Sequence, residues 1–156
     1  MKKNGGDLKV LATNRKAHHD YFILETYEAG MALLGTEVKS AREGKINLKE
    51  AFCAAQRGEL FLENCHISPY GHGGYQNHDP LRLRKLLLHK REITKLASKI
   101  AERGLTIVPL RAYVKDGRVK LEIGLAKGKK SWDKREDIKR RETDREIRRG
   151  AKDVER

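Results

Sequence analysis

Apolar residues alternate with polar ones in one segment of this chain, with the period of a β-strand that has one buried and one solvent-facing side. The clearest run is Arg118–Ala126, and the segment Leu105–Val114 precedes it. Their connection, Lys115–Gly117, contains the Asp-Gly pair that is typical of tight hairpin turns. These two segments are therefore predicted to form an antiparallel hairpin.

A second hairpin is predicted earlier in the chain. Ala51–Gln56 and Glu59–Glu63 flank the short connection Arg57-Gly58, which has the length of a two-residue turn. Just before it, Asn47 is placed to cap a single helical turn over Leu48–Ala51.

The N-terminal part contains one further strand pattern. Tyr21–Glu28 is rich in aromatic and β-branched residues and predicts a strand. Gly30 and Gly35 interrupt the apolar residues that follow. Because glycine inside a strand often marks a bulge or a barrel corner, Thr36–Ser40 is expected to continue the same long, bent strand.

One segment follows the helical period instead. Asp79 is a good N-cap, Pro80 suits the first helical position, and Gly104 fits the position after the last turn. The pattern predicts a helix over about residues 80–103. Its apolar residues recur at helical spacing; they are Leu83, Leu86, Leu87, Ile93, Leu96, Ala97 and Ile100.

These elements together predict a mainly-β fold. About six antiparallel strands with few long connections favour a small closed barrel, and a barrel with an inserted helix is similar to the OB folds that bind oligonucleotides. We expect this OB-like domain to span residues 8–126, with flanking helices. Residues 1–7 are expected to be a disordered N-terminus without a signal peptide.

The last thirty residues differ in composition from the rest. Residues 127–156 hold 13 Lys+Arg and 8 Asp+Glu, whereas residues 1–126 hold 22 and 14. Too few apolar residues remain in this basic tail to form a core, so it is predicted to be disordered when free and helical when docked on a charged partner. Three acid-before-base pairs four residues apart support the helix; they are Glu136–Arg140, Asp137–Arg141 and Asp144–Arg148.

Charge narrows the choice of partner. The formal net charge is +13 on 156 residues, which indicates a polyanion, with nucleic acid ahead of an anionic membrane surface. No apolar run approaches the length of a membrane span. The two cysteines, Cys53 and Cys65, are too few for a disulfide scaffold, and reduced thiols in a cytoplasm are expected.

Catalytic or metal chemistry has no positive support in the motifs. Cys65, His66, His72 and His78 gather around one loop but lack the spacing of a metal site, so no metal or other cofactor is predicted. Lys127–Ser131 lacks the full pattern of a phosphate-binding loop, and no serine has the surroundings of a nucleophile elbow. The protein is therefore not expected to be an enzyme.

Several sequence blocks, taken in order, resemble one bacterial family. The resemblance is to the SsrA-binding proteins, also called small protein B, which are the protein partners of transfer-messenger RNA. It runs from about residue 8 to residue 149. The blocks are Asn14–Ala17 with His19–Tyr21, Glu28–Gly30 with Gly35–Ser40, Asp79-Pro80 with Arg84–Lys90, Gly124–Lys130, and Asp133–Arg135.

The resemblance implies a function. It implies binding to the tRNA-like domain of transfer-messenger RNA and delivery of that RNA to stalled ribosomes for trans-translation, in which the nascent peptide is tagged and the ribosome is rescued. It also implies a cytoplasmic monomer in a 1:1 complex with the RNA, with the tail sensing the empty mRNA channel near the decoding centre. No chemistry by the protein itself is implied.

The resemblance also implies two sets of site residues. The RNA-binding set contains cations for phosphates and polar side chains for bases or 2′-OH groups; it is Asn14, Arg15, Lys16, His19, Glu28, Lys39, Arg84, Lys85, Leu87, Lys120, Lys127 and Gly128. The second set is the part of the tail that contacts the ribosome; it is Lys129, Lys130, Trp132, Asp133, Lys134, Arg135, Lys139 and Arg140. Trp132 lies where the family varies, and its stacking on a ribosomal RNA base is a separate hypothesis that rests on its aromatic ring.

Two alternatives stay open. One is a general OB-type RNA-binding protein or RNA chaperone, and the other is an RNA-processing enzyme. Affinity for transfer-messenger RNA against bulk tRNA and random single strands separates the first from the family function, and turnover of labelled RNA tests the second.

Overall fold

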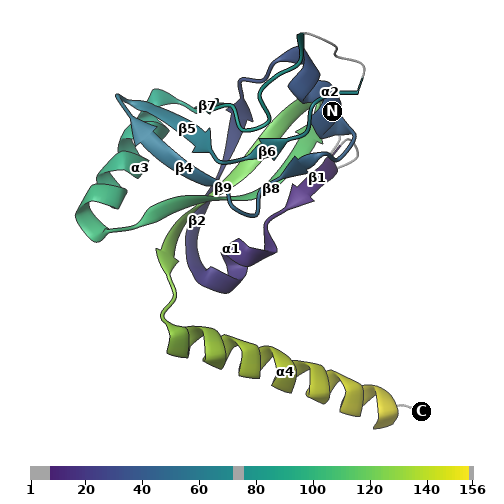
Figure 1. Ribbon diagram of the computed structural model, residues 1–156. Coiled ribbons are helices and arrows are strands. Elements are labelled where there is room, and N and C mark those ends of the chain that lie inside the picture. The colour runs from purple at the N-terminus through teal and green to yellow at the C-terminus, as the bar shows by residue number, and fades with distance from the viewer. Residues whose placement is uncertain (1–7, 72–75, 155–156) are drawn as a thin grey trace, which may run out of the picture.

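A computed structural model describes residues 8–71 and 76–154 of the chain. Six antiparallel strands form a ring; they are β2 (Tyr21–Met31), β4 (Phe52–Gln56), β5 (Glu59–Glu63), β7 (Arg84–Leu87), β8 (Thr106–Lys115) and β9 (Arg118–Gly128). Their order is β8-β4-β5-β7-β2-β9, and β9 pairs again with β8, which closes the barrel (Figure 1). The predicted fold class, a closed mainly-β barrel of about six strands, is confirmed.

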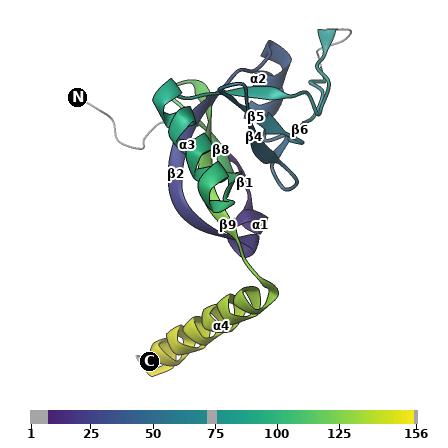
Figure 2. The same ribbon diagram turned by 90° about the vertical axis from the view of Figure 1, so that its left-hand side faces the viewer.

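The remaining elements surround this barrel. Strand β1 (Lys9–Thr13) pairs with β8 outside the ring, and β3 (Ile46–Asn47) pairs with β6 (His66–Ile67) in a separate small sheet. The helices are α1 (Arg15–Asp20), α2 (Gly35–Arg42), α3 (Lys90–Arg103) and α4 (Ser131–Val154). Figures 1 and 2 show α1, α2 and α3 against the barrel and α4 standing apart from it.

Both predicted hairpins are present. In the β8–β9 turn, Asp116 and Gly117 have φ angles of 52° and 75°, and in the β4–β5 turn, Arg57 and Gly58 have φ angles of 53° and 76°. Positive φ at both central residues is the geometry whose twist matches that of paired strands, which explains why a glycine occupies the second position in each turn.

The apolar faces of the strands form two cores. The main core fills the barrel, where Leu86, Leu121 and Ile123 have no exposed surface. A second, smaller core lies beneath α1 and includes Ala17, Val108, Leu110 and Ala126. Register shifts lie between Ile23 and Glu25 on β2 and between Pro109 and Arg111 on β8. Because a bulge changes the face to which the following side chains point, β8 contributes Ile107 to the main core before its shift and Ala112 after it.

Gly124 lies where the second core is tightest. A Cβ atom at this position would lie 3.0 Å from Ile23 Cγ2 and 3.1 Å from Leu110 Cδ1. A larger residue at position 124 would therefore require the Ile23 and Leu110 side chains to shift.

Two sequence predictions about helices are wrong. Thr36–Ser40 lies in α2 and does not continue β2, which itself runs through Gly30 to Met31. A Glu37 carboxylate oxygen accepts the Leu34 backbone N–H at 2.7 Å at the start of α2, so a side-chain cap decides the local structure.

The helix predicted over about 80–103 begins ten residues later, at Lys90. Asp79 instead caps a turn, where its carboxylate accepts the Leu81 backbone N–H at 2.9 Å. The intervening segment contains β7, in which Arg84 and Leu86 are buried while Lys85 and Leu87 are exposed. The C-terminal end was predicted correctly, since Gly104 has a φ of 62° and its N–H bonds to the Ile100 carbonyl at 3.0 Å.

A buried ion cluster fixes the connection between α2 and β7. The side chains of Glu37 and Arg84 have no exposed surface, and Arg84 Nε donates to Glu37 Oε2 at 2.7 Å. Arg82 Nη2 donates to the other oxygen, Oε1, at 2.6 Å. Arg84 also donates to the Cys65 and Pro80 carbonyls, so its guanidinium holds three chain segments together.

The two ends of the chain differ in what the structure describes. The helix predicted within the basic tail is present as α4, and its dependence on a partner stays a prediction. Residues 1–7, expected to be disordered, lie outside the described residues. Within the described part of the chain, no helix is long and apolar enough to cross a membrane.

Candidate nucleic-acid interface

The barrel brings part of the predicted RNA-binding set onto its outer face. Leu87 on β7 lies against Gly30 on β2, where a Cβ atom on the glycine would lie 3.3 Å from Leu87 Cβ. A shallow cavity of about 250 Å³ beside them is also lined by Lys120 of β9 and Val38 of α2. Leu87 is 51% exposed, so an apolar contact surface with a neighbouring cation is open to solvent here.

Glu28 lies on β2 within reach of this surface. The Tyr113 hydroxyl donates to Glu28 Oε2, and Lys115 Nζ lies 3.3 Å from the same oxygen. The hydrogen bond from Tyr113 is the main reason that the pKa of Glu28 is lowered, with Lys115 and Lys120 adding to it against the effect of burial. The carboxylate is therefore ionised at neutral pH and accepts hydrogen bonds only.

Two further cations of the set lie near by but are engaged within the protein. Lys85 Nζ forms a 3.1 Å ion pair with Glu59, and both side chains are nearly half exposed. Lys39 of α2 lies over the ring of Tyr70, with Nζ 5.5 Å from the centroid. Exposed pairs of this kind are weak, so a phosphate can compete for either lysine.

The α1 residues of the set form a different site. Val108, under α1, and Tyr113, beside Glu28, are five residues apart on β8, which is roughly 16 Å at the usual rise of a strand. Arg15, Lys16 and His19 are exposed on α1. The sequence grouped them with Glu28 and Leu87, and the structure separates the two groups.

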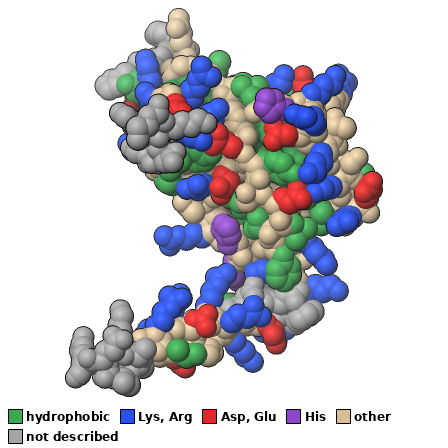
Figure 3. Space-filling view, turned by 180° about the vertical axis from the view of Figure 1, so that it is seen from behind, with side chains coloured by type: hydrophobic (Ala, Val, Ile, Leu, Met, Phe, Trp, Pro, Cys, Tyr) green, Lys and Arg blue, Asp and Glu red, His purple; other side chains and the backbone are tan. Residues whose placement is uncertain are grey.

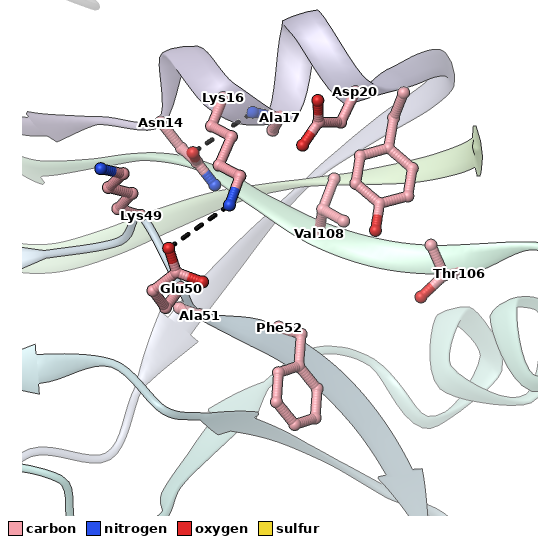
Figure 4. Close-up of a pocket in the computed structure, with 11 residues that line it drawn as sticks. Asn14, Lys16, Ala17, Asp20, Lys49, Glu50, Ala51, Phe52, Thr106 and Val108 are labelled. Carbon is pink, nitrogen blue, oxygen red and sulfur yellow. Dashed lines mark hydrogen bonds and ion pairs between the residues drawn. The ribbon is translucent and has the colours of Figure 1, made fainter. Parts of the chain in front are cut away.

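A cavity of about 200 Å³ lies between α1 and the start of β4 (Figure 4). Lys16 bridges its mouth with a 3.3 Å ion pair to Glu50. Phe52, which is 46% exposed, lies on the opposite wall from α1. This cavity joins a cation to an exposed aromatic ring, a combination that suits contact with RNA.

The root of the tail lies against α1. The Lys129 backbone N–H donates to the Asp20 carbonyl at 2.8 Å, and Lys129 Nζ donates to the His18 carbonyl at 3.2 Å. The same ammonium lies 5.0 Å from the centre of the Phe22 ring. Lys127 and Gly128, at the end of β9, are exposed just before this contact. The α1 group therefore adjoins the start of the tail, and the structure fixes the point from which α4 leaves the barrel.

Two members of the RNA-binding set are engaged inside the protein. Arg84 has no exposed surface and is bound to Glu37, so the prediction that it contacts RNA is wrong in this structure. Asn14 is 5% exposed and uses both side-chain atoms within the protein, because its Nδ2 donates to the Pro109 carbonyl and its Oδ1 accepts the Ala17 N–H. Asn14 thus caps α1 and joins it to β8.

The predicted ribosome-contacting set lies mainly on α4. Arg135, Lys139 and Arg140 are exposed on the helix, and Lys130 is exposed just before it. The side chains of Trp132, Asp133 and Lys134 lie outside the described residues. Their predicted roles stay predictions.

The sequence missed Tyr113, the residue that holds Glu28. Tyr113 lies in a strand between Ala112 and Val114. The sequence signal that could have pointed to it is a tyrosine hydroxyl two positions after Arg111 in an otherwise apolar segment. Figure 3 shows that basic side chains are spread over one side of the barrel and along α4, with acidic ones among them. A basic stripe alone therefore does not locate the interface.

The cysteines and histidines do not form a metal centre in the described part of the chain. No group of three His, Cys, Asp or Glu side chains is placed to hold an ion there, and His72 of the predicted loop cluster lies outside it. Cys53 and Cys65 are buried free thiols. Burial raises the pKa of Cys65 to about 11, so the thiol is protonated and unreactive.

Known proteins resemble this chain over most of its length. The family described as SmpB protein matches residues 11–153. The chain belongs to the SmpB family. The SsrA-binding protein of Geobacillus kaustophilus (strain HTA426) is 60% identical over 148 residues, covering 95% of this chain and 96% of the relative. That of Enterococcus faecalis (strain ATCC 700802 / V583) is 58% identical over 147 residues, covering 94% and 96%.

A solved structure of the same family supports the fold. A chain of the structure "tmRNA-SmpB: a journey to the center of the bacterial ribosome" is 52% identical and superposes with a TM-score of 0.66. The similarity covers 81% of this chain and 93% of that one. The resemblance stated from the sequence blocks is thus confirmed.

Proposed function

We propose that this protein binds the tRNA-like domain of transfer-messenger RNA and delivers it to stalled ribosomes for trans-translation. The observation that carries the proposal is the match to the SmpB family over residues 11–153. The relatives described above are called SsrA-binding proteins, and the similar solved structure is named for tmRNA and SmpB at the center of the bacterial ribosome.

The barrel supplies the surface for the folded RNA. Leu87 and Lys120 line one open cavity, Glu28 lies beside them, and Lys85 is on the same exposed side of β7. Folded RNA is recognised by its shape and its hydroxyl groups. On this surface the leucine can pack against a sugar or base, the carboxylate can accept a hydrogen bond from a base amine or 2′-OH, and the lysines can bind phosphates.

The tail supplies the second contact. Lys127, Gly128, Lys129 and Lys130 form its root at α1, and α4 carries the remaining cations away from the barrel (Figure 2). On the ribosome the helix lies along the empty mRNA channel, where tail and message exclude one another. Asp133, Lys134 and Arg135 contact ribosomal RNA near the decoding centre, and Trp132 stacks on one of its bases.

Other parts of the proposal follow from this role. A protein that works on ribosomes in a bacterium acts in the cytoplasm, and a single barrel suffices for a 1:1 complex with one RNA. The protein does no chemistry of its own and needs no cofactor, because its contribution is placement of the RNA.

Binding measurements at several salt concentrations test the function. We expect affinity for transfer-messenger RNA to exceed affinity for bulk tRNA and random single strands, and added protein to restore peptide tagging on ribosomes stalled at the end of a message. Equal affinity for all RNAs without restored tagging would instead favour the alternative, a general OB-type RNA-binding protein or chaperone.

A further inference from the structure

Glu28 presents one oxygen to the protein and the other to solvent. Its Oε2 accepts the Tyr113 hydroxyl and faces Lys115 Nζ at 3.3 Å. Among the described residues, Oε1 has no hydrogen-bond partner, and the side chain is 41% exposed. The carboxylate is therefore tied by one oxygen and open at the other.

Tyr113 itself is held firmly. It is 3% exposed, and the Arg111 guanidinium lies 5.0 Å from the centre of its ring. Arg111 in turn lies 3.6 Å from a carboxylate oxygen of Glu122 on β9. Burial and the hydrogen bond to Glu28 raise the pKa of Tyr113 well above its usual value, so the phenol remains a neutral donor.

We propose that Tyr113 is a positioning residue that orients Glu28 for hydrogen bonding to RNA. The proposal rests on the proposed function, in which Glu28 faces the RNA. With Oε2 bound to a buried phenol, Oε1 points at one place on the barrel surface. The ligand group that fits is a hydrogen-bond donor, either a base N–H or a ribose 2′-OH, because an ionised carboxylate only accepts.

The orientation of Glu28 affects RNA affinity through the conformational entropy of its side chain. A glutamate without a partner samples several rotamers and loses that freedom when it binds, whereas one that is already held loses less. From the usual cost of ordering one side chain, we expect removal of the Tyr113 hydroxyl to weaken RNA binding about 3- to 10-fold.

The chain contains a matched control for this hydroxyl. Tyr27, also a phenol, donates to Glu25 Oε2 at 2.6 Å, and Glu25 pairs with Lys99 of α3 at 2.6 Å. This second phenol–carboxylate bond faces α3 and not the Leu87 surface. Tyr27→Phe therefore removes the same chemical bond at a place where the proposal gives it no role in RNA binding.

The experiment is a double-mutant cycle with the full-length protein and transfer-messenger RNA. Tyr113→Phe is expected to weaken binding about 3- to 10-fold in the parent protein and to add no loss in a Glu28→Ala background. Tyr27→Phe is expected to leave affinity unchanged. Thermal unfolding of each variant shows separately whether folding is affected.

A titration followed by carboxyl NMR adds a readout independent of RNA. The pKa of Glu28 is expected to rise toward its usual value in Tyr113→Phe and to stay the same in Tyr27→Phe. An unchanged Glu28 pKa, or an equal affinity loss in the Glu28→Ala background, would overturn the positioning role. Failure of the parent protein to prefer this RNA would overturn the proposed function instead.

Discussion

The barrel and the α4 tail hold their charges in opposite ways. In the barrel, Glu37 and Arg84 are fully buried, and Glu37 accepts several hydrogen bonds while Arg84 donates several. In α4, the described charged side chains are exposed, and among them neither Glu136 with Arg140 nor Asp144 with Arg148 forms an ion pair. For these two pairs, the four-residue spacing in the sequence does not appear as contacts, and the Asp137 side chain of the third pair lies outside the described residues.

The difference shows what each region needs. Glu37 and Arg84 stabilise the fold, whereas a surface charge such as Glu28, held by the Tyr113 hydroxyl, has its position set before a ligand binds. A helix of 24 residues without apolar support is marginal by itself, so its cations are expected to gain fixed positions from a partner. The proposed division follows from this difference: we expect the barrel to recognise the RNA and the tail to depend on its partner for a fixed structure.

The largest expected effect separates these two roles. Replacing Asp133, Lys134 and Arg135 by alanine is expected to abolish peptide tagging on ribosomes stalled without a codon, because the tail would lose its proposed ribosomal contact. Affinity for transfer-messenger RNA is expected to stay nearly intact, since the proposed RNA surface lies on the barrel. Tagging of a reporter peptide and RNA binding by the same preparation measure both.

A control of equal charge lies farther along α4. Replacing Asp144, Arg145 and Arg148 by alanine removes the same net charge from the same helix. Tagging is expected to survive in this variant to a much greater extent. A large loss of RNA binding in the first variant would contradict the division between barrel and tail.

The next effect is on the stability of the barrel alone. Glu37→Gln leaves Arg84 buried beside an uncharged partner, and breaking a buried ion pair in this way costs about 3–5 kcal/mol of unfolding free energy. Denaturant unfolding measures the loss. Glu43→Gln is the matched control, since Glu43 forms an exposed 3.2 Å pair with Lys45 whose loss costs about 0–1 kcal/mol.

The same carboxylate gives the barrel an acid-sensitive component. Burial opposes ionisation of Glu37, but hydrogen bonds from Arg82, the Leu34 N–H and Arg84 outweigh it, so its pKa is lowered from the usual 4.5. Because the pKa of Glu37 is lower in the folded protein than in the unfolded chain, its ionised form stabilises the fold at pH values above the unfolded-state pKa. This stabilisation is lost as the pH falls below that pKa. Stability of the parent protein is therefore expected to fall with acid below about pH 5, and less steeply in Glu37→Gln.

Local patterns in the sequence predicted the barrel better than the site. The hairpins were predictable because turn residues and alternating apolar positions agree. Arg84 was not, since its charge indicates a surface residue until Glu37, 47 positions away, is brought beside it. Leu83, Leu86 and Leu87 fit a helical spacing, yet Arg84–Leu87 pairs with β2 and β5, so tertiary pairing overrides the local period.

The site was predicted less completely than the fold for a related reason. A single sequence gives no distance between Arg15 on α1 and Glu28 on β2, so both entered one RNA-binding set. Tyr113 was missed because its role depends on a partner 85 positions away. Long-range pairs of this kind become visible only when the strand register is known.

A smaller effect tests the barrel surface itself. Replacing Lys85 and Lys120 by alanine is expected to weaken RNA binding and to flatten the slope of log affinity against log salt by about two units at most. Replacing Lys95 and Arg103 of α3 is the control of equal charge and is expected to leave the slope unchanged. An equal change in both variants would mean that the barrel attracts RNA by total charge and not by this face.

The smallest effect concerns the tail helix in the absence of a partner. Because Glu136 and Arg140, both described in the structure, form no ion pair with each other, Glu136→Gln is expected to change the stability of the helix by less than the few tenths of a kcal/mol that a formed pair contributes. Backbone amides of α4 are expected to exchange with solvent almost freely in both proteins, while those of β8 and β9 stay protected by the barrel. Hydrogen exchange measures both regions in one experiment. Strong protection of the α4 amides from exchange in the free protein would contradict this expectation. It would show that the tail helix is stable without the ribosome.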